Sequence, residues 1–354
     1  MKNKNLLVVT SELKFSGPNN VIKYLVNELV EKEEYITHLA SLRVKSDSKY
    51  TDSLKLPKNK IYIQKGYSSL FHLAFVIFKL KPEVVNSHGI RADLFTFLVS
   101  LFIKFKHVST VHNIPHQDYI MRYGRFLGNV MVFMHSFLFK SDRVKKIAVS
   151  KYARDFLIDI GKAKNVAFVY NGVCSREFNS DKNDNNLFPV GYSARILFCG
   201  HFSEIKNPFA VSVVATENPS YHFTMLGDGP LRERIESLAV NNISVMGRVT
   251  NVKEYLSEAD VFIMPSLTEG MPMAIIEAML MGLPIVCSDI PIFNELSKIP
   301  NIALFIFSNE IEGDFGKKIN LALSFKVNNN RDIALKYFSS DVMMRGYVEV
   351  FNER

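Results

Sequence analysis

The chain has 354 residues, 47% of them hydrophobic and 22% charged, which excludes a wholly disordered protein and is enough for two domains with cores of their own. No apolar run approaches the roughly 18 residues of a spanning helix, and the N-terminal run is too short for a signal peptide. Three cysteines without metal-ligand spacing indicate reduced, buried thiols. We therefore expect a cytoplasmic protein that is neither exported nor integral to a membrane.

The charge is unevenly distributed. Residues 1–170 carry 27 Lys and Arg and 13 Asp and Glu, a net +14, whereas the remainder carries 16 and 22, a net −6. A basic half joined to a mildly acidic one favours an anionic surface or substrate for the basic half. Since no recognised nucleic-acid motif accompanies this charge, nucleic acid is not expected as a partner.

The first half alternates between strand and helix patterns. Apolar runs predict strands at 6–10, 36–40, 61–63, 84–86, 107–111, 147–150 and 166–170. A loop containing Gly17 and Asn19 follows the first strand and enters a helix, while His88, His112 and Asn113 follow later strands. This alternation predicts an α/β protein with open, doubly wound sheets.

Three segments of this half are rich in phenylalanine and poor in acidic residues: 70–81, 94–106 and 122–140. They are consistent with core helices that carry cations at their ends. They are equally consistent with helices that lie in a membrane interface. The polar run at 175–195 predicts an interdomain linker. The expected domains are residues 1–175 and 190–337, with a C-terminal helix at about 338–354.

The second half contains the stretch on which the function depends. Val261–Met264 reads as a buried strand, a turn follows, and Pro272 stands where a first helical residue is favoured. The helix is expected to end at Gly282, before another strand at 283–287. The free N–H groups at such a helix start suit a phosphate, and carboxylates at Glu269 and Glu277 suit sugar hydroxyls.

The string EGMPMAIIEAMLMGLPIVCSD resembles the E-x7-E signature of the retaining family 4 glycosyltransferases. That resemblance implies the GT-B fold, in which two Rossmann-like, doubly wound domains face a central cleft. GHFSEIKNP is similar to the family's Gly-Arg-x-x-x-x-Lys-Asn segment, with Lys206 matching and His201 in the place of the arginine. SHGIRAD and TVHN resemble the family's pieces on the acceptor side.

The resemblance assigns roles to individual residues. His112, Glu269 and Lys206 are implied to be catalytic. Donor binding is implied for Gly17, His201, Lys206, Gly270, Met271, Pro272, Met273 and Glu277. Asn19, His88 and Asn113 are implied on the acceptor side. No metal or cofactor is expected, in agreement with the lack of an Asp-x-Asp motif, and a UDP-sugar is favoured over a GDP-sugar as the co-substrate.

The implied reaction is the transfer of a hexose, with retention, from a nucleoside diphosphate sugar to a saccharide acceptor. The basic, phenylalanine-rich half favours a lipid-linked acceptor, and hence a peripheral enzyme at the anionic inner face of the cell membrane in bacterial surface polysaccharide synthesis. A non-hydrolysing nucleotide-sugar epimerase shares the fold and is one alternative. An inactive nucleotide-sugar-binding partner is another, and His201 is the residue that favours it. A hydride-transferring enzyme is not expected, because no Gly-x-Gly-x-x-Gly follows a strand.

Overall fold

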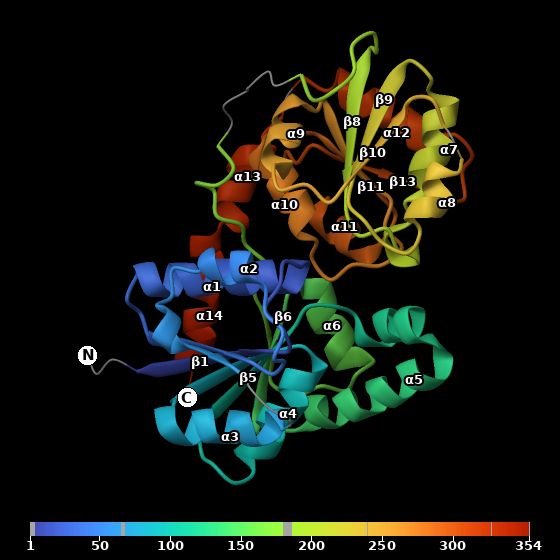
Figure 1. The fold of residues 1–354 in the computed structure, drawn as a ribbon. Helices are drawn as coiled ribbons and strands as arrows, with labels where there is room; N and C mark the ends of the chain where they lie inside the picture. Colours follow the sequence, from blue (N-terminus) through green and yellow to red (C-terminus); the bar gives the residue numbers. More distant parts are fainter. Residues whose placement is uncertain (1–3, 65–67, 180–185, 239, 327, 354) are drawn as a thin grey trace. The chain divides into compact units, whose positions relative to one another are not determined.

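The computed structural model describes residues 4–64, 68–179, 186–238, 240–326 and 328–353, with Arg122 described in its backbone alone. The chain divides into two compact units (Figure 1). Unit 1 comprises Met1–Val173 with Ser340–Arg354, and unit 2 comprises Cys174–Ser339. None of the described helices is both long and apolar enough to cross a bilayer.

Unit 1 is built on a parallel sheet of seven strands in the order β3-β2-β1-β4-β5-β6-β7. The strands are β1 (Asn5–Thr10), β2 (Ile36–Ser41), β3 (Ile61–Ile63), β4 (Val84–His88), β5 (Lys106–Val111), β6 (Val144–Ala148) and β7 (Val166–Phe168). All seven strands predicted for this half are therefore present. The central strands are buried on both faces, which is why they read as continuous apolar runs.

The helices of unit 1 cover this sheet. They are α1 (Gly17–Glu31), α2 (Ser48–Asp52), α3 (Ser69–Leu80), α4 (Ile90–Ser100), α5 (Pro115–Lys140), α6 (Lys151–Asp159) and α14 (Ser340–Asn352), with a 3-10 turn η1 (Lys58–Lys60). Capping decides some of the boundaries. Ser150, expected in a strand, instead caps α6, since its Oγ accepts the N–H of Ala153 at 3.1 Å.

The C-terminal helix α14 returns to unit 1, where it packs against α1. The hydroxyl of Ser340 donates to the buried carboxylate of Glu28 at 2.6 Å. At its other end, Nζ of Lys106 donates to the carbonyl of Val350 at 2.7 Å. A lysine near the end of a helix satisfies carbonyls that the helix itself leaves unpaired.

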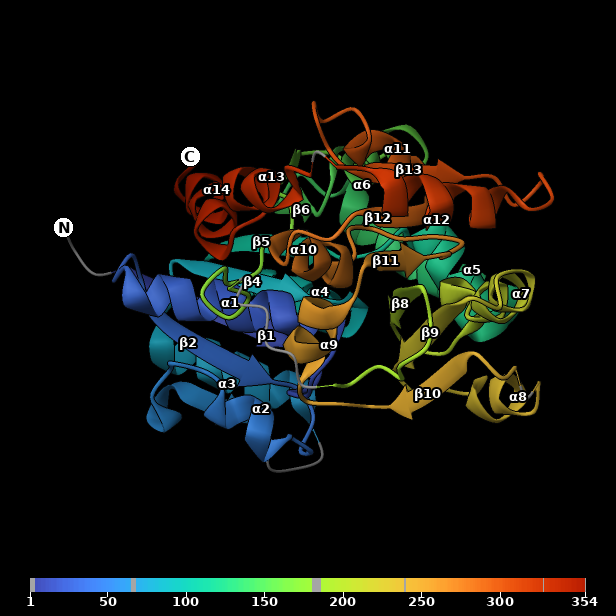
Figure 2. The ribbon, with the colours of Figure 1, turned by 90° about the horizontal axis from the view of Figure 1, so that it is seen from above.

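Unit 2 contains a second parallel sheet, of six strands in the order β10-β9-β8-β11-β12-β13 (Figure 2). The strands are β8 (Ala194–Cys199), β9 (Tyr221–Leu226), β10 (Ile243–Gly247), β11 (Val261–Met264), β12 (Ile285–Ser288) and β13 (Leu304–Phe307). The helices are η2 (Glu204–Lys206), α7 (Phe209–Glu217), α8 (Arg232–Glu236), α9 (Val252–Glu258), α10 (Met273–Leu280), α11 (Pro291–Leu296), α12 (Asp314–Ser324) and α13 (Asn330–Tyr337).

The polar run at 175–195 is only partly a linker. Phe178 and Phe188 are buried, and the N–H of Leu187 donates to the carboxylate of Glu258 in α9 at 3.0 Å. The described part of this run therefore belongs to the packing of unit 2. Residues 180–185, which the linker prediction also covers, lie outside the described residues.

Each sheet has one point at which the strand order reverses. In unit 1 the reversal lies between β1 and β4, and in unit 2 it lies between β8 and β11. In open α/β sheets, ligands bind outside the carboxyl ends of the strands at such a reversal. The loops after these four strands are therefore the places where each unit is expected to bind a ligand.

Candidate active site

Two loops meet at the reversal point of unit 2. Residues 200–207 follow β8 and residues 265–272 follow β11, and the N–H of Leu267 donates to the carbonyl of Ile205 at 2.8 Å. Lys206 and Glu269 form an ion pair across these loops, with 23% and 11% of their side chains exposed. The pair places one cation and one carboxylate, both partly exposed to solvent, where this class of sheet binds ligands.

The Gly-Asp-Gly turn after β9 packs tightly against the β8 loop. Gly227 has a φ of +142°, and a Cβ built there would lie 1.8 Å from the carbonyl oxygen of Gly200. A Cβ on Gly229 would lie 2.8 Å from Cε1 of His201. Only glycine permits this approach, so the turn has a structural role. His201 is exposed beside it.

Helix α10 begins at this site. Pro272 is its N-cap and not its first helical residue, a correction of one position to the prediction, and the side chain of Pro272 makes no capping hydrogen bond. The backbone N–H groups at a helix start carry a partial positive charge. Gly270 to Met273 are buried here, beside the Lys206–Glu269 pair. At the other end Gly282 has a φ of +76°, which confirms it as the residue that ends the helix.

Glu277 lies one turn into α10 and is half-buried. The pKa of the Cys199 thiol, at the end of β8, indicates which charged groups lie near it. Burial is the main cause that raises the pKa of Cys199 to about 12; the charge of Glu277 raises it further and that of Lys206 lowers it. Lys206 and Glu277 therefore both lie close to the carboxyl end of β8.

In unit 1 a pair of histidines lies at the carboxyl ends of β4 and β5. Nδ1 of His88 is 2.8 Å from Nε2 of His112, and Nε2 of His88 is 2.8 Å from Oδ1 of Asn86. The side-chain amide nitrogen of Asn86 donates to the carbonyl of Val108 at 3.1 Å and to Oγ1 of Thr110 at 3.0 Å. These two bonds fix the orientation of the amide, so its oxygen faces His88.

This arrangement determines the position of each proton. His88 donates from Nε2 to Asn86 and so accepts at Nδ1 from Nε2 of His112, which leaves a lone pair on Nδ1 of His112. Burial lowers the pKa of His88 well below its usual value, with a smaller effect from His112, and lowers the pKa of His112 to about 4. Both rings are neutral at pH 7. Nδ1 of His112 is buried without a hydrogen-bond partner among the described residues, so it is suited to accept one from a ligand hydroxyl.

The other residues expected in unit 1 have mixed roles. Gly17 opens α1, and a Cβ there would meet nothing within 4 Å, so the space beside it is open. Asn19 is buried, and its side chain accepts from Oγ1 of Thr10 at 3.1 Å and donates to the carbonyls of Glu12 and Lys14 at 2.9 and 2.7 Å. Asn19 therefore holds the loop after β1 in place, and its place on the acceptor side stays a prediction.

Sequence reasoning missed two residues that orient the expected ones. Asn86 fixes the tautomer of His88, and its position two residues earlier on the same face of a strand was the available signal. Asp118 accepts from the amide of Asn113 at 2.5 Å. Nothing in the sequence pattern distinguished Asp118 from an ordinary residue near the start of a helix.

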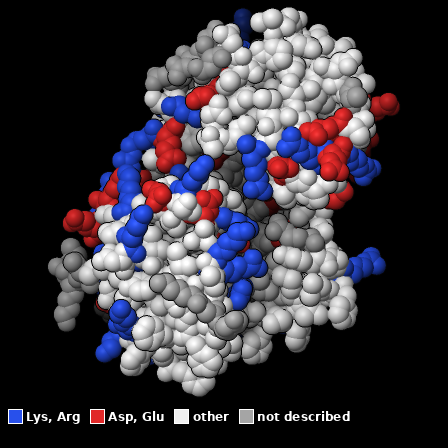
Figure 3. Space-filling model, in the orientation of Figure 1, with Lys and Arg blue, Asp and Glu red and all other residues white. Residues whose placement is uncertain are grey.

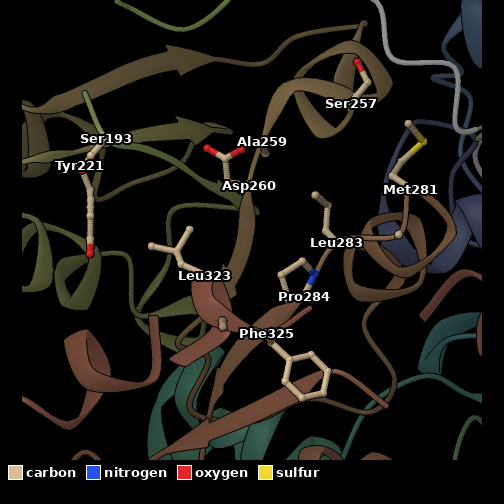
Figure 4. Close-up of a pocket in the computed structure, with 12 residues that line it drawn as sticks. Ser193, Tyr221, Ser257, Ala259, Asp260, Met281, Leu283, Pro284, Leu323 and Phe325 are labelled. Carbon is tan, nitrogen blue, oxygen red and sulfur yellow. The ribbon is translucent and has the colours of Figure 1, made fainter. Parts of the chain in front are cut away.

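A hollow of about 600 Å³ lies elsewhere in unit 2 (Figure 4). Its lining includes Ser193, Asp260 and Pro284, the residues that directly precede β8, β11 and β12 respectively. In a parallel sheet this is the edge opposite the carboxyl ends, where Lys206 and Glu269 lie. The hollow is therefore separate from the candidate site.

Two family models match the chain, one in each unit. The model described as "Glycosyltransferase Family 4" matches residues 15–176, and the one described as "Glycosyl transferases group 1" matches residues 193–324. This chain belongs to the family 4 glycosyltransferases. The matched ranges contain the histidine pair of unit 1 and the Lys206–Glu269 pair and α10 of unit 2.

Known proteins similar to this glycosyltransferase agree with that assignment. The Escherichia coli O-antigen biosynthesis glycosyltransferase WclY is 25% identical over 367 residues, covering 97% of each chain. The fold matches sucrose-phosphate synthase from Thermosynechococcus elongatus with a TM-score of 0.80 at 14% identity, covering 99% of this chain and 98% of the other. Anabaena HepE, solved in complex with UDP-glucose, matches with a TM-score of 0.80 at 13% identity, covering 97% and 98%. These matches show that the predicted GT-B fold is correct.

Proposed function

We propose that this glycosyltransferase transfers a hexose from a nucleoside diphosphate sugar to a saccharide acceptor with retention at the anomeric carbon, and that a UDP-sugar is the donor in preference to a GDP-sugar. The observation that carries the proposal is the Lys206–Glu269 pair beside the start of α10, at the reversal point of the unit 2 sheet. A cation and free backbone N–H groups suit a diphosphate, and a neighbouring carboxylate suits sugar hydroxyls. The UDP-glucose bound to the structurally similar HepE supports the choice of nucleotide.

The proposed reaction needs little covalent chemistry from the protein. The bond between the anomeric carbon and the diphosphate oxygen breaks, and the acceptor oxygen bonds to that carbon from the same face. The acceptor's proton passes to the departing phosphate oxygen. Lys206 and the N-terminus of α10 stabilise the negative charge that develops on the diphosphate. No divalent metal takes part in this scheme.

The remaining residues position the substrates. Glu277 accepts hydrogen bonds from the ribose hydroxyls, and Glu269 accepts one from the transferred sugar. In unit 1 the lone pair on Nδ1 of His112 accepts from a sugar hydroxyl, and His88 keeps that lone pair available. Correct placement of reacting groups can supply a large part of an enzyme's rate enhancement.

The acceptor that we propose is a lipid-linked saccharide, extended at the cytoplasmic face of the cell membrane during bacterial surface polysaccharide synthesis. The name of the similar WclY, an O-antigen biosynthesis enzyme, supports the pathway. The net charge of +14 on residues 1–170 supports a peripheral enzyme at an anionic membrane.

A donor screen followed by product analysis tests the proposal. A bound donor stabilises the folded state by mass action, so one UDP-sugar should raise the melting temperature more than its GDP counterpart. Transfer to a short saccharide acceptor should then give a product with the donor's anomeric configuration by NMR. An inverted product would refute retention, and epimerisation of the donor without transfer would favour the epimerase alternative. Absence of any stabilisation by nucleotide sugars would refute donor binding itself.

A further inference from the structure

Two helices of unit 1, α3 and α5, expose phenylalanine on their outer surface. On α3, Phe71, Phe75 and Phe78 are 78%, 64% and 68% exposed. On α5, Phe126, Phe133 and Phe137 are 85%, 76% and 68% exposed. We call these six residues the phenylalanine face. Helix α4 packs against both α3 and α5, and Phe102 in the turn after α4 is 89% exposed.

These rings are exposed because the other faces of the helices form the core. Leu73, Val76 and Ile77 of α3 are buried, as are Leu138 and Phe139 of α5. One face of each of these two helices thus packs in the core, while the opposite face is apolar and exposed. Soluble proteins rarely leave large apolar side chains contiguous and uncovered, and such patches mark interaction sites.

The geometry of α5 directs its phenylalanines outward. Gly124, with a φ of +79° and a ψ of 168°, interrupts the helix, and a Cβ on Gly128 would lie 2.7 Å from Cα of Ile120. The second arm of α5 therefore folds back against the first. The hydroxyl of Tyr119 lies 2.9 Å from Nδ1 of His135, a contact between the two arms.

His135 fixes the rotation of the second arm. Its Nε2 lies 3.0 Å from the carboxylate of Asp93 in α4, and the two side chains are 2% and 0% exposed. At about 100° per residue, Phe126, Phe133 and Phe137 point roughly 160° to 200° away from His135 around the helix. Because His135 faces inward, these three rings must face solvent.

The exposed charges described on the helices of the phenylalanine face and on α4 have one sign. Helices α3, α4 and α5 contain two carboxylates, Asp93 and Asp118, and both are buried. The exposed charges on and beside these helices include Lys79, Lys104 and Arg125. The lower part of unit 1 in Figure 3 accordingly shows little acidic surface.

We propose that the phenylalanine face is the membrane-docking surface of the enzyme, with its rings inserted into an anionic bilayer and the surrounding cations at the headgroups. An apolar face whose helices carry exposed cations and no exposed carboxylate among the described residues matches an anionic lipid surface. A second copy of the chain would fit less well, because a symmetric contact would bring the same cations opposite one another. This inference rests on the proposed membrane-bound acceptor and adds the residues that reach the bilayer.

Vesicle co-sedimentation of the full chain tests the proposal. Vesicles that contain phosphatidylglycerol are compared with purely zwitterionic ones at low and high salt. The triple variant Phe126→Ser/Phe133→Ser/Phe137→Ser removes three exposed rings without opening a cavity. The matched control, Val190→Ser/Val213→Ser/Ile311→Ser, removes three apolar side chains of unit 2 that are 91%, 60% and 57% exposed.

We expect binding that requires the anionic lipid and weakens with salt, and that falls about tenfold or more in the triple variant while the control binds like the wild type. Transfer to a water-soluble acceptor should be unchanged in the triple variant. Failure to bind anionic vesicles at low salt, or equal binding by the triple variant, would overturn the proposal. A wild-type dimer that the triple variant converts to monomer would also overturn it, in favour of a second copy. Vesicle binding without sugar transfer would support the docking surface and refute the proposed function alone.

Discussion

Lys206 and Glu269 are 63 positions apart in the sequence, yet they form an ion pair at the reversal point of the unit 2 sheet. One lies on the loop after β8 and the other on the loop after β11. The pair neutralises both charges while the donor is absent. A diphosphate that approaches Lys206 would compete with Glu269, which frees the carboxylate to accept a sugar hydroxyl.

Replacing Lys206 should affect the chemical step more than donor binding, because charge develops on the diphosphate as it departs. We expect Lys206→Ala to lower kcat by about 100-fold or more, and Lys206→Arg to retain more activity because it keeps the charge. Steady-state kinetics with saturating donor and acceptor measure this. If Lys206→Ala raised only the KM, the assignment to leaving-group stabilisation would be wrong.

Glu277→Ala should weaken donor binding while the fold persists. Losing charge-assisted hydrogen bonds to a diol costs roughly 1.5–3 kcal/mol, so the Kd of the nucleotide sugar should rise about 10- to 150-fold in calorimetry. Glu310→Ala, at an exposed position of unit 2, serves as the control and should bind as the wild type does. Equal donor affinities in the two variants would show that Glu277 does not bind the donor.

His88 should act through His112. His88→Ala removes the ring that accepts the proton of Nε2 of His112, so the tautomer of His112 is no longer fixed. We expect kcat/KM to fall by about one to two orders of magnitude. Nitrogen NMR shifts of His112 would report a mixed tautomer in the variant and a single one in the wild type. His222→Asn, which removes a histidine bonded to Ser244 in unit 2, is the matched control and should leave both readouts unchanged. A fall in activity with an unchanged tautomer would show that His88 acts differently.

Transfer should proceed without added divalent metal. Lys206 and the start of α10 provide positive charge at the proposed diphosphate site, which is the role a metal would otherwise take. We expect an excess of chelator to leave the initial rate within about twofold of the untreated value, a change of less than 0.5 kcal/mol in the barrier. Loss of activity that magnesium or manganese restores would show that the mechanism requires a metal.

Unit 1 should lose stability as the pH falls below neutrality. Burial lowers the pKa of His107 to about 3 and of His112 to about 4, against 6.5 in the unfolded chain. Between about pH 6.5 and 4 the unfolded chain binds protons that the folded chain excludes. The free energy of unfolding therefore decreases as the pH decreases through this range. Above pH 6.5 these groups are neutral in both states and contribute no pH dependence.

Each such histidine contributes a slope of up to about 1.4 kcal/mol per pH unit in that range. Urea unfolding monitored at pH 7.5, 6 and 5 should therefore show a falling midpoint, and His107→Gln should flatten the dependence. The same slope in His107→Gln and in the wild type would mean that His107 does not titrate as its burial requires.

The sequence by itself determined the strands, the class of fold and the place where helix α10 begins and ends, to within one residue. Strands in parallel sheets are buried on both faces, so apolar runs such as Val261–Met264 reveal them directly. The α10 segment was readable for a similar reason, because Glu269, the helix start and Gly282 are neighbours in the chain and their roles depend on local backbone geometry.

The tertiary structure alone decided which distant groups share a site and which apolar faces stay exposed. The sequence placed His88 and His112 after strands, but their contact depends on β4 and β5 being adjacent. Only the structure shows that the side-chain amide of Asn19 is bonded to Thr10 and within the loop after β1. The phenylalanine-rich segments permitted both a core and an interfacial reading. A sequence gives the periodicity of a helix but not its rotation, and in α5 that rotation follows from the buried contact of His135 with Asp93, 42 residues earlier in the chain.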